Sequence, residues 1–462
     1  MLRRILIYMA LVLGATGIAR ADSSTVLVYP FENQSNDRTL DWIGEGISEL
    51  INQRLQPEPG VYIFSREERI AMYDKLGIPE TAGLSRATAL KVGWDAGADE
   101  TITGTFSGTA EKFHIEARLV DMEQGSASVM HVDGRLEDVI PLTMTLSLQL
   151  LKKIVPGTAS PETDYTARPP TPRSAFENYV RGILNQDLQK RIELLQTAVR
   201  LYPQYAAALF QLGRAYHLQR EFRMSNQWLQ KLPDNTPDRL QVQFLIGLNY
   251  FYLADYPHAI AAFQQLPQGY DVLLNLGAAF SQKGDSAGAM STWKRAAALD
   301  PLNSDSFFDM GYASFLKGDF EATEKNLSDS LKLRGRDSEA LFLLGRTYEK
   351  MGRMEESQKL VTQASRLSQR VERWLTQPLP KLERFSTATT FRSHADQWND
   401  RRLALRGKGL GLSAWLEVVQ SDLDSHLFGD ALRELHDVMR VYPDSPEARS
   451  LLEEVDRQRN LK

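Results

Sequence analysis

Two glycine-rich motifs in the sequence could bind phosphate groups. Gly44-Glu45-Gly46 lies between an expected strand and an expected helix, but Glu49 stands where a dinucleotide-binding motif requires its third glycine. In Gly407-Lys408-Gly409 a glycine follows the lysine, where a P-loop requires Ser or Thr. We therefore interpret the first motif as a glycine-tolerant turn between a strand and a helix, and the second as a flexible loop.

The residues that bind metals or act as nucleophiles form no recognisable motif. The seven histidines include no His-x-His, His-x-x-x-His or His-Glu-x-x-His spacing, and no Gly-x-Ser-x-Gly motif occurs. The lack of cysteine excludes disulfides, thiolate zinc sites and a cysteine nucleophile. His114 and His131 fall on neighbouring expected strands, where packing of the rings across the strands is the commoner arrangement. We predict no enzyme activity, no catalytic residue, no metal site and no cofactor, although distant residues can still assemble a catalytic site.

A row of large side chains instead indicates a surface that binds another protein. The residues three positions before each of five regularly spaced glycines are apolar, and the residues one position after each glycine lie on the same helix face. Such a stripe suits an extended or helical peptide segment. The alternative, that these aromatic side chains pack between helices, stays open. The partner-binding candidates are Phe210, Arg214, Phe244, Phe308, Tyr312, Phe342 and Arg346.

The five glycines mark an internal repeat, and their spacings are 34, 30, 34 and 34 residues for Gly213, Gly247, Gly277, Gly311 and Gly345. The clearest unit, from Leu273 to Pro301, resembles the tetratricopeptide (TPR) repeat family in its residues Gly277, Ala289 and Trp293. The resemblance implies an all-α superhelical solenoid, whose concave groove would receive the candidate side chains. The short interval indicates a four-residue deletion, which we expect in the turn from Leu266 to Tyr270.

The region before the repeats alternates expected strands and helices. Short apolar runs indicate the strands, and apolar residues at helical spacing indicate the helices. The last three strands are expected to form a meander, so the fold class is an α/β domain with a small mixed sheet and packed helices. The expected strands are 25–31, 61–64, 100–109, 112–121 and 127–136, and the expected helices are 40–55, 66–76, 85–96 and 140–154.

Four motifs in this region point to a known domain family. They are V-L-V-Y-P-F-E-N-Q-S at 26–35, D-W-I-G-E-G-I-S-E-L-I at 41–51, A-G-A-D-E-T-I-T-G-T-F at 96–106 and H-I-E-A-R-L-V-D at 114–121. With them the region resembles the TolB N-terminal-like domain and, more distantly, the CsgG and FlgO group of envelope proteins. Members are commonly exported or membrane-associated and are often fused to TPR arrays. The resemblance implies no particular ligand for the domain.

The first residues have the pattern of a Sec-type signal peptide. Arg3 and Arg4 precede an uncharged, largely apolar run, and Ala19-Arg20-Ala21 is a small-x-small cleavage site. The run is short for a membrane span. We expect export to the periplasm or beyond with cleavage after Ala21, and an uncleaved anchor is the alternative. Cleavage would make the formal net charge of −5 more negative, which argues against general nucleic-acid binding.

The chain is expected to divide into six segments. Proline-rich residues 156–173 would form an extended linker between independently folded units. The basic cluster Arg401, Arg402, Arg406 and Lys408 belongs to a later irregular segment, either as a solvated loop or as a site for an anionic partner. The segments are a signal peptide (1–21), the α/β domain (22–155), the linker (156–173), the TPR array (174–373), the irregular segment (374–413) and TPR-like helices (414–462).

These patterns favour a non-catalytic scaffold or adaptor of the bacterial cell envelope, which binds a partner protein or peptide segment through its concave TPR surface. The main alternative is an envelope assembly or secretion component that self-associates through the TolB/CsgG-like domain. A hydrolase of envelope polymers is a third class and has no motif in its favour. We expect neither nucleic-acid binding nor stable membrane insertion after signal cleavage.

Overall fold

The computed structural model of the 462-residue chain contains two compact units, which divide between Gln211 and Leu212. The structure describes residues 24–386 with the exception of 57, 59–60, 81, 123–124, 156–170, 234–235 and 237–238, and after that 416, 419–420, 423, 431–432, 435, 438–439 and 445–460.

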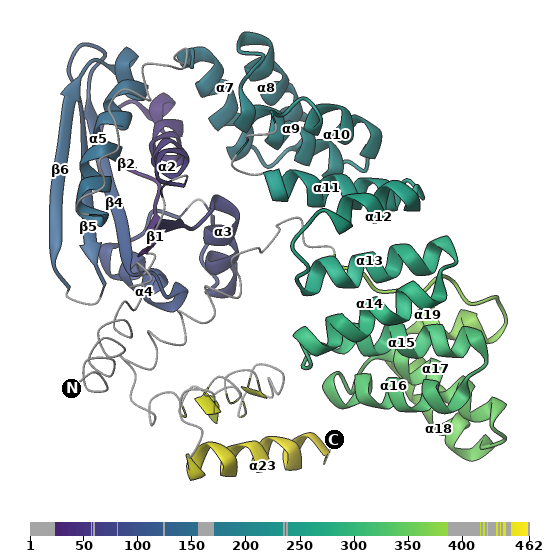
Figure 1. Ribbon diagram of the computed structural model, residues 1–462. Helices are drawn as coiled ribbons and strands as arrows, with labels where there is room; N and C mark the ends of the chain where they lie inside the picture. The colour runs from purple at the N-terminus through teal and green to yellow at the C-terminus, as the bar shows by residue number, and fades with distance from the viewer. Residues whose placement is uncertain are drawn as a thin grey trace, which may run out of the picture. The chain divides into compact units, whose positions relative to one another are not determined.

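The first unit begins with a six-stranded mixed sheet (Figure 1). The strand order is β3-β1-β4-β5-β6, and the short β2 also pairs with β4. β1 runs parallel to β3 and β4, whereas β4, β5 and β6 form an antiparallel meander. The expected small mixed sheet is confirmed. Its strands are β1 Ser24–Val28, β2 Glu32–Asn33, β3 Val61–Ile63, β4 Glu100–Gly108, β5 Phe113–Asp121 and β6 Ala127–Gly134.

Four helices accompany the sheet, and each begins and ends within two residues of its expected bounds. α2 and α5 pack against each other, α5 also contacts β5 and β6, and α4 contacts β4. Apolar residues at helical spacing predicted α2, and Ile43, Ile47 and Ile51 are fully buried in it. The helices are α2 Trp42–Leu55, α3 Arg66–Lys75, α4 Arg86–Ala96 and α5 Val139–Ile154.

The two histidines of the meander lie side by side. The ring centroids of His114 and His131 are 5.7 Å apart, and Nδ1 of His114 lies 2.8 Å from Oδ1 of Asp133 on the neighbouring strand. This is the ring packing across strands that the sequence predicts.

Helical hairpins follow, two helices to a repeat. In each repeat the glycine of the first helix lies against a large side chain of the second. A Cβ at Gly277 would lie 2.4 Å from Nε1 of Trp293, and one at Gly311 would lie 2.7 Å from Cδ2 of Leu327, so the contact requires glycine. The helices are α7 Arg173–Leu184, α8 Leu188–Leu201, α9 Ala206–Leu218, α10 Phe222–Leu229, α11 Arg239–Tyr252, α12 Tyr256–Gln264, α13 Tyr270–Lys283, α14 Ser286–Leu299, α15 Ser304–Lys317, α16 Phe320–Leu333, α17 Ser338–Lys350 and α18 Met354–Leu367.

The deletion in the short repeat lies in a helix, and our expectation that it lies in the turn is wrong. α12 has 9 residues, whereas the equivalent helices α14 and α16 each have 14. The turns that follow the three helices are of similar length. Pro267 explains the early end of α12, because a proline disfavours helical geometry in the residue before it and lacks the N–H that the helix needs.

The last described elements follow α18. α19 (Gln369–Glu372) and the 3₁₀ turn η3 (Arg373–Leu375) lead into an extended segment, which the structure describes as far as Ser386. Nearer the C-terminus, helix α23 (Pro446–Asn460) contributes Ala448 and Val455 to a buried cluster. Ala431, Leu435 and Val438, from the expected TPR-like helices (414–462), belong to the same cluster.

The first hairpin packs on the α/β domain, although we expected independently folded units. The hydroxyl of Tyr179 on α7 donates a hydrogen bond of 2.7 Å to Oε2 of Glu49 on α2. The rings of Phe176 and Trp42 meet edge to face with centroids 5.9 Å apart. A Cβ at Gly46 would lie 3.0 Å from the Phe176 ring, so glycine allows this close approach. α7 is therefore a structural part of the first unit.

Glu49 is a buried acid in this contact, and its ionisation is coupled to stability. Burial, and after it the neighbouring Glu45, raises the pKa of Glu49 to about 7 from an ordinary value of 4.5. Between these two values the unfolded chain has released the proton while the folded chain keeps it. The contribution of Glu49 to stability therefore falls as pH rises from about 4.5, and the loss is complete above about pH 7.

We expect Glu49→Gln to raise the free energy of unfolding by about 1 to 3 kcal/mol at pH 8 and to leave it nearly unchanged at pH 4. Glutamine keeps an acceptor oxygen for the Tyr179 hydroxyl but cannot ionise. Urea unfolding of both proteins at the two pH values measures the difference. The exposed Glu137→Gln is the control, with a change within about 0.5 kcal/mol at both values. Equal stabilisation by Glu49→Gln at pH 4 and pH 8 would contradict the raised pKa.

Candidate peptide-binding groove

Most of the partner-binding residues that the sequence predicts are buried. The side chains of Phe244, Phe308 and Phe342 are 0% exposed and that of Tyr312 is 4% exposed. The expectation of an open aromatic stripe is therefore wrong. Phe244 and Phe342 instead pack between helices, which was the alternative interpretation. The ring centroid of Phe244 lies 5.9 Å from that of Phe263, and the centroid of Phe342 lies 5.5 Å from that of Trp374 in η3.

The remaining candidates lie at the helix surface. Phe210 and Arg214, both on α9, are partly exposed. Arg346 is also partly exposed and forms an ion pair of 2.6 Å with Glu349 one turn further along α17. Each is accessible in part, and their binding to a partner stays a prediction.

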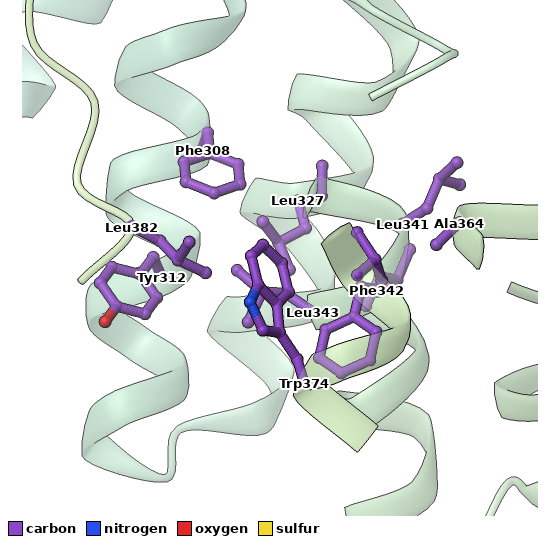
Figure 2. Close-up of a cluster of buried hydrophobic side chains, with 12 residues drawn as sticks. Phe308, Tyr312, Leu327, Leu341, Phe342, Leu343, Ala364, Trp374 and Leu382 are labelled. Carbon is purple, nitrogen blue, oxygen red and sulfur yellow. The ribbon is translucent and has the colours of Figure 1, made fainter. Parts of the chain in front are cut away.

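Phe308 and Tyr312 are covered by a segment of the same chain. We call Leu379–Ser386 the groove segment. Figure 2 shows its Leu382 beside Phe308 and Tyr312, and the three share one buried cluster with Trp374. The hydroxyl of Tyr312 donates to the carbonyl oxygen of Pro380 at 3.2 Å. We expected the residues of the groove segment to belong to the irregular segment 374–413, and they form no helix or strand. They lie along the first helices of the repeats.

Two polar side chains hold the main chain of the groove segment. Oδ1 of Asn275 accepts the N–H of Ser386 at 2.7 Å, and Nδ2 of Asn275 donates to the carbonyl of Ser386 at 3.3 Å. Oδ1 of Asp309 accepts the N–H of Arg384 at 2.7 Å. The two contacts are two residues apart, so they hold one edge of an extended chain. Main-chain contacts of this kind give affinity for an extended peptide, and side-chain pockets add specificity.

The side chain of Arg384 enters an acidic pocket. Its Nη1 lies 3.0 Å from Oδ1 of Asp305, and its Nη2 lies 2.5 Å from Oδ2 of Asp337. The guanidinium carbon also lies 3.6 Å from the centroid of the Phe308 ring. Asp337 can serve two purposes, because its Oδ1 accepts the first N–H groups of α17 and leaves Oδ2 for the arginine. The pocket is thus built by the N-terminal ends of α15 and α17.

Burial of these groups changes their ionisation. Burial opposes the charge of Arg384, but Asp337 and Asp305 outweigh it and raise the pKa of the guanidinium. Burial raises the pKa of Asp309 well above its usual range, and the N–H and charge of Arg384 offset part of that rise. Arg384 therefore stays charged in the groove, and it supplies the positive charge that these acids face.

The neighbouring side chains of the groove segment have partners of their own. The ring of Phe385 lies 5.0 Å from Phe251 and 5.5 Å from Tyr252 on α11. Oε1 of Glu383 accepts from the hydroxyl of Ser281 on α13 at 2.9 Å. Residues 379–386 thus contact first helices of four consecutive repeats, α11, α13, α15 and α17.

The two residues that hold the main chain were not among the sequence candidates. Asn275 and Asp309 occupy the position two residues before the repeat glycine, where the neighbouring repeats have Leu245 and Leu343. Both polar side chains are buried, like those leucines. A buried polar residue needs a hydrogen-bond partner. A polar residue at a leucine position of the repeat was therefore the signal that could have identified this site.

None of the motifs considered for phosphate or anion binding belongs to the described residues of this groove. Gly44 and Gly46 lie inside α2 and not in a turn, and a Cβ at Gly44 would lie 2.1 Å from the carbonyl oxygen of Phe31. Gly407-Lys408-Gly409 and the basic cluster lie outside the described residues. Within the described ranges there is no group of three acids or histidines that could hold a metal ion. Among the same residues, no helix combines the length and the apolar character needed to cross a bilayer.

One hairpin of the repeat region matches a known protein family. Residues 338–370, which cover α17 and α18, match the family model of the tetratricopeptide repeat. No curated protein matches the chain. Similar solved structures include MamA (16% identity, 38% of this chain and 98% of that chain, TM-score 0.33) and the type IV pilus biogenesis factor PilW (18% identity, 44% and 96%, TM-score 0.37). Another is YrrB, described as a TPR protein with an unusual peptide-binding site (14% identity, 38% and 94%, TM-score 0.32).

Identities and TM-scores this low give no information about what the chain binds. The family match and the order of elements concern the fold. The chain is a small mixed α/β domain followed by a solenoid of helical hairpins, one of which matches the family model of the tetratricopeptide repeat.

Proposed function

We propose that this protein is a non-catalytic scaffold that binds an extended segment of a partner protein in the groove formed by α11, α13, α15 and α17. One observation supports the proposal above all others: Asn275 and Asp309 hold the main chain of an extended segment in that groove. These contacts do not depend on the side chains of the bound segment. The mechanism is recognition and tethering, and no covalent bond is made or broken.

A peptide titration tests this proposal. The probe is a fluorescent peptide with the sequence of residues 378–386, and the protein is the full chain with Arg384→Ser and Phe385→Ser, which we call the segment variant. We expect the segment variant to bind the peptide. The matched control adds Asn275→Leu and Asp309→Leu, which are the residues of the neighbouring repeats at this position. We expect the control to bind at least about tenfold more weakly, a loss of about 1.4 kcal/mol. A folded segment variant that binds no peptide would contradict the proposal.

We also propose that the protein is exported and acts in the bacterial cell envelope, with a TolB-like first domain. The support is the signal-peptide pattern at 1–21, which lies outside the described residues, together with the four family-like motifs of the α/β domain. Mass spectrometry of the protein from periplasmic extract tests the location. An N-terminus at Asp22 is the expected result, and a chain that keeps Met1 in the cytoplasm would contradict it.

Self-association through the α/β domain is the second candidate function. β6 favours it, because among the described strands it pairs with β5 alone and Val129 on it is 50% exposed. An edge strand of this kind can pair with another chain. Sedimentation of the full chain and of Val129→Lys decides the question. A concentration-dependent dimer that the substitution abolishes would favour self-association, and a monomer at all concentrations would exclude it.

A further inference from the structure

We propose that the partner segment carries an arginine followed directly by an aromatic residue, and that it binds by replacing Arg384 and Phe385 of the chain's own groove segment. This inference rests on the proposed function and adds the chemistry of the partner and the identity of its competitor.

The charges of the groove require a cation from the ligand. Asp305, Asp337 and Glu339 converge on the guanidinium of Arg384, the last at 3.6 Å. A second arginine, Arg334, lies 3.1 Å from Asp305, but its side chain is 53% exposed and largely solvated. A neutral ligand would bury the carboxylates without compensating their charge, which is strongly unfavourable. An acidic ligand would add repulsion to this cost.

The geometry of the pocket selects arginine over lysine. Two different nitrogen atoms of Arg384 bind two different carboxylates, while its flat face lies on the Phe308 ring. A guanidinium is planar and presents several donors in a fixed fork, so it can satisfy all three contacts at once. A lysine ammonium is a single point charge on a flexible chain and cannot cover the ring in the same way.

The residues on either side of Arg384 complete the pattern. Phe385 contacts the aromatic pair Phe251 and Tyr252. Two residues before Arg384, Leu382 is buried in the cluster around Tyr312. Between them, Oε1 of Glu383 accepts a hydrogen bond of 2.9 Å from the hydroxyl of Ser281. The groove therefore selects the sequence leucine-x-arginine-aromatic. It is least selective at the second position, which Glu383 occupies.

The groove segment acts as a tethered competitor. It begins only a few residues after η3, so it is covalently held beside the groove that it occupies. A segment on a short tether has an effective concentration in the millimolar range. A partner binds only the fraction of molecules whose groove is open, and its apparent affinity is lower by that fraction.

A series of three peptides tests the inference. They are the sequence of residues 378–386, the same peptide with lysine in place of its arginine, and the same peptide with alanine in place of its phenylalanine. Each is titrated into the wild-type chain and into the segment variant. We expect the unchanged peptide to bind the segment variant at least about tenfold more tightly than either altered peptide, and at least tenfold more tightly than it binds the wild type.

The outcomes separate this inference from the function on which it rests. Equal binding of all three peptides by the segment variant would overturn the arginine-aromatic specificity and leave the proposed function standing. No binding of any peptide by a folded segment variant would overturn both. A wild-type dimer that the segment variant does not form would identify a second copy as the occupant and overturn the inference. If circular dichroism shows that the segment variant is unfolded, Arg384→Lys takes its place. We expect this variant to bind the unchanged peptide more tightly than the wild type does, but less tightly than a chain whose groove is always open.

Discussion

Replacement of Arg384 by leucine is expected to lower the free energy of unfolding of the second unit by about 3 kcal/mol, because it leaves buried carboxylates without their cation. Asp305 and Asp337 would lose the guanidinium that contacts both of them. A leucine side chain cannot compensate the negative charge of these carboxylates. We therefore expect the groove segment to leave the groove as well. Urea unfolding measures the stability, and hydrogen exchange of the amides of residues 379–386 measures release of the segment.

Arg334→Leu is the matched control for this change. Arg334 also forms an ion pair with Asp305, at 3.1 Å, but it is largely exposed. Exposed ion pairs contribute little, so we expect a change of at most about 1 kcal/mol and no faster exchange in the groove segment. Similar losses for the two variants would contradict the view that burial makes the Arg384 pocket different from a surface ion pair.

Trp293→Ala is expected to cost about 3 to 5 kcal/mol of stability in the second unit, the range for removal of a fully buried large side chain. Trp293 is 0% exposed and fills the space between α13 and α14 against Gly277. Its Nε1 donates to the carbonyl oxygen of Leu274 at 3.3 Å, next to Asn275 in the chain. The substitution should therefore also disturb the residue that holds Ser386. Urea unfolding and the peptide titration measure the two effects.

Leu299→Ala on the same helix controls for the loss of apolar volume. Leu299 is 57% exposed, so we expect a change within about 0.5 kcal/mol and no effect on peptide binding. If Trp293→Ala lowered the free energy of unfolding no more than this control does, the contact between Trp293 and Gly277 would not be what stabilises the packing of α13 on α14.

Local patterns were sufficient to predict most of the fold. Short apolar runs predicted the strands of the α/β domain, and apolar residues at helical spacing predicted its helices, as Ile43, Ile47 and Ile51 show for α2. The glycine spacing predicted the hairpins because each glycine lies against a large residue of the next helix, as Gly277 lies against Trp293. These features depend on residues that are close in the sequence.

The groove could not be predicted in the same way. Asn275 contacts Ser386, which is 111 residues away, and Asp309 contacts Arg384, 75 residues away. The groove segment is extended and irregular, so no periodicity marks it. The sequence could therefore place Phe308 and Tyr312 on one helix face, but it could not show that the chain itself covers them. The contact of Tyr179 with Glu49, 130 residues away, was missed for the same reason.

The packing of α7 on α2 makes the α/β domain a cap for the first helical hairpin. A stack of repeats needs its end units covered by a polar surface, because each repeat buries its apolar face only against a neighbour. On α7, Phe176, Tyr179 and Val180 are almost fully buried, and the first two of them contact Trp42 and Glu49 of the α/β domain. A repeat array cut free at residue 174 would expose this aromatic end to water. Its solubility would then depend on a surface that only the α/β domain provides.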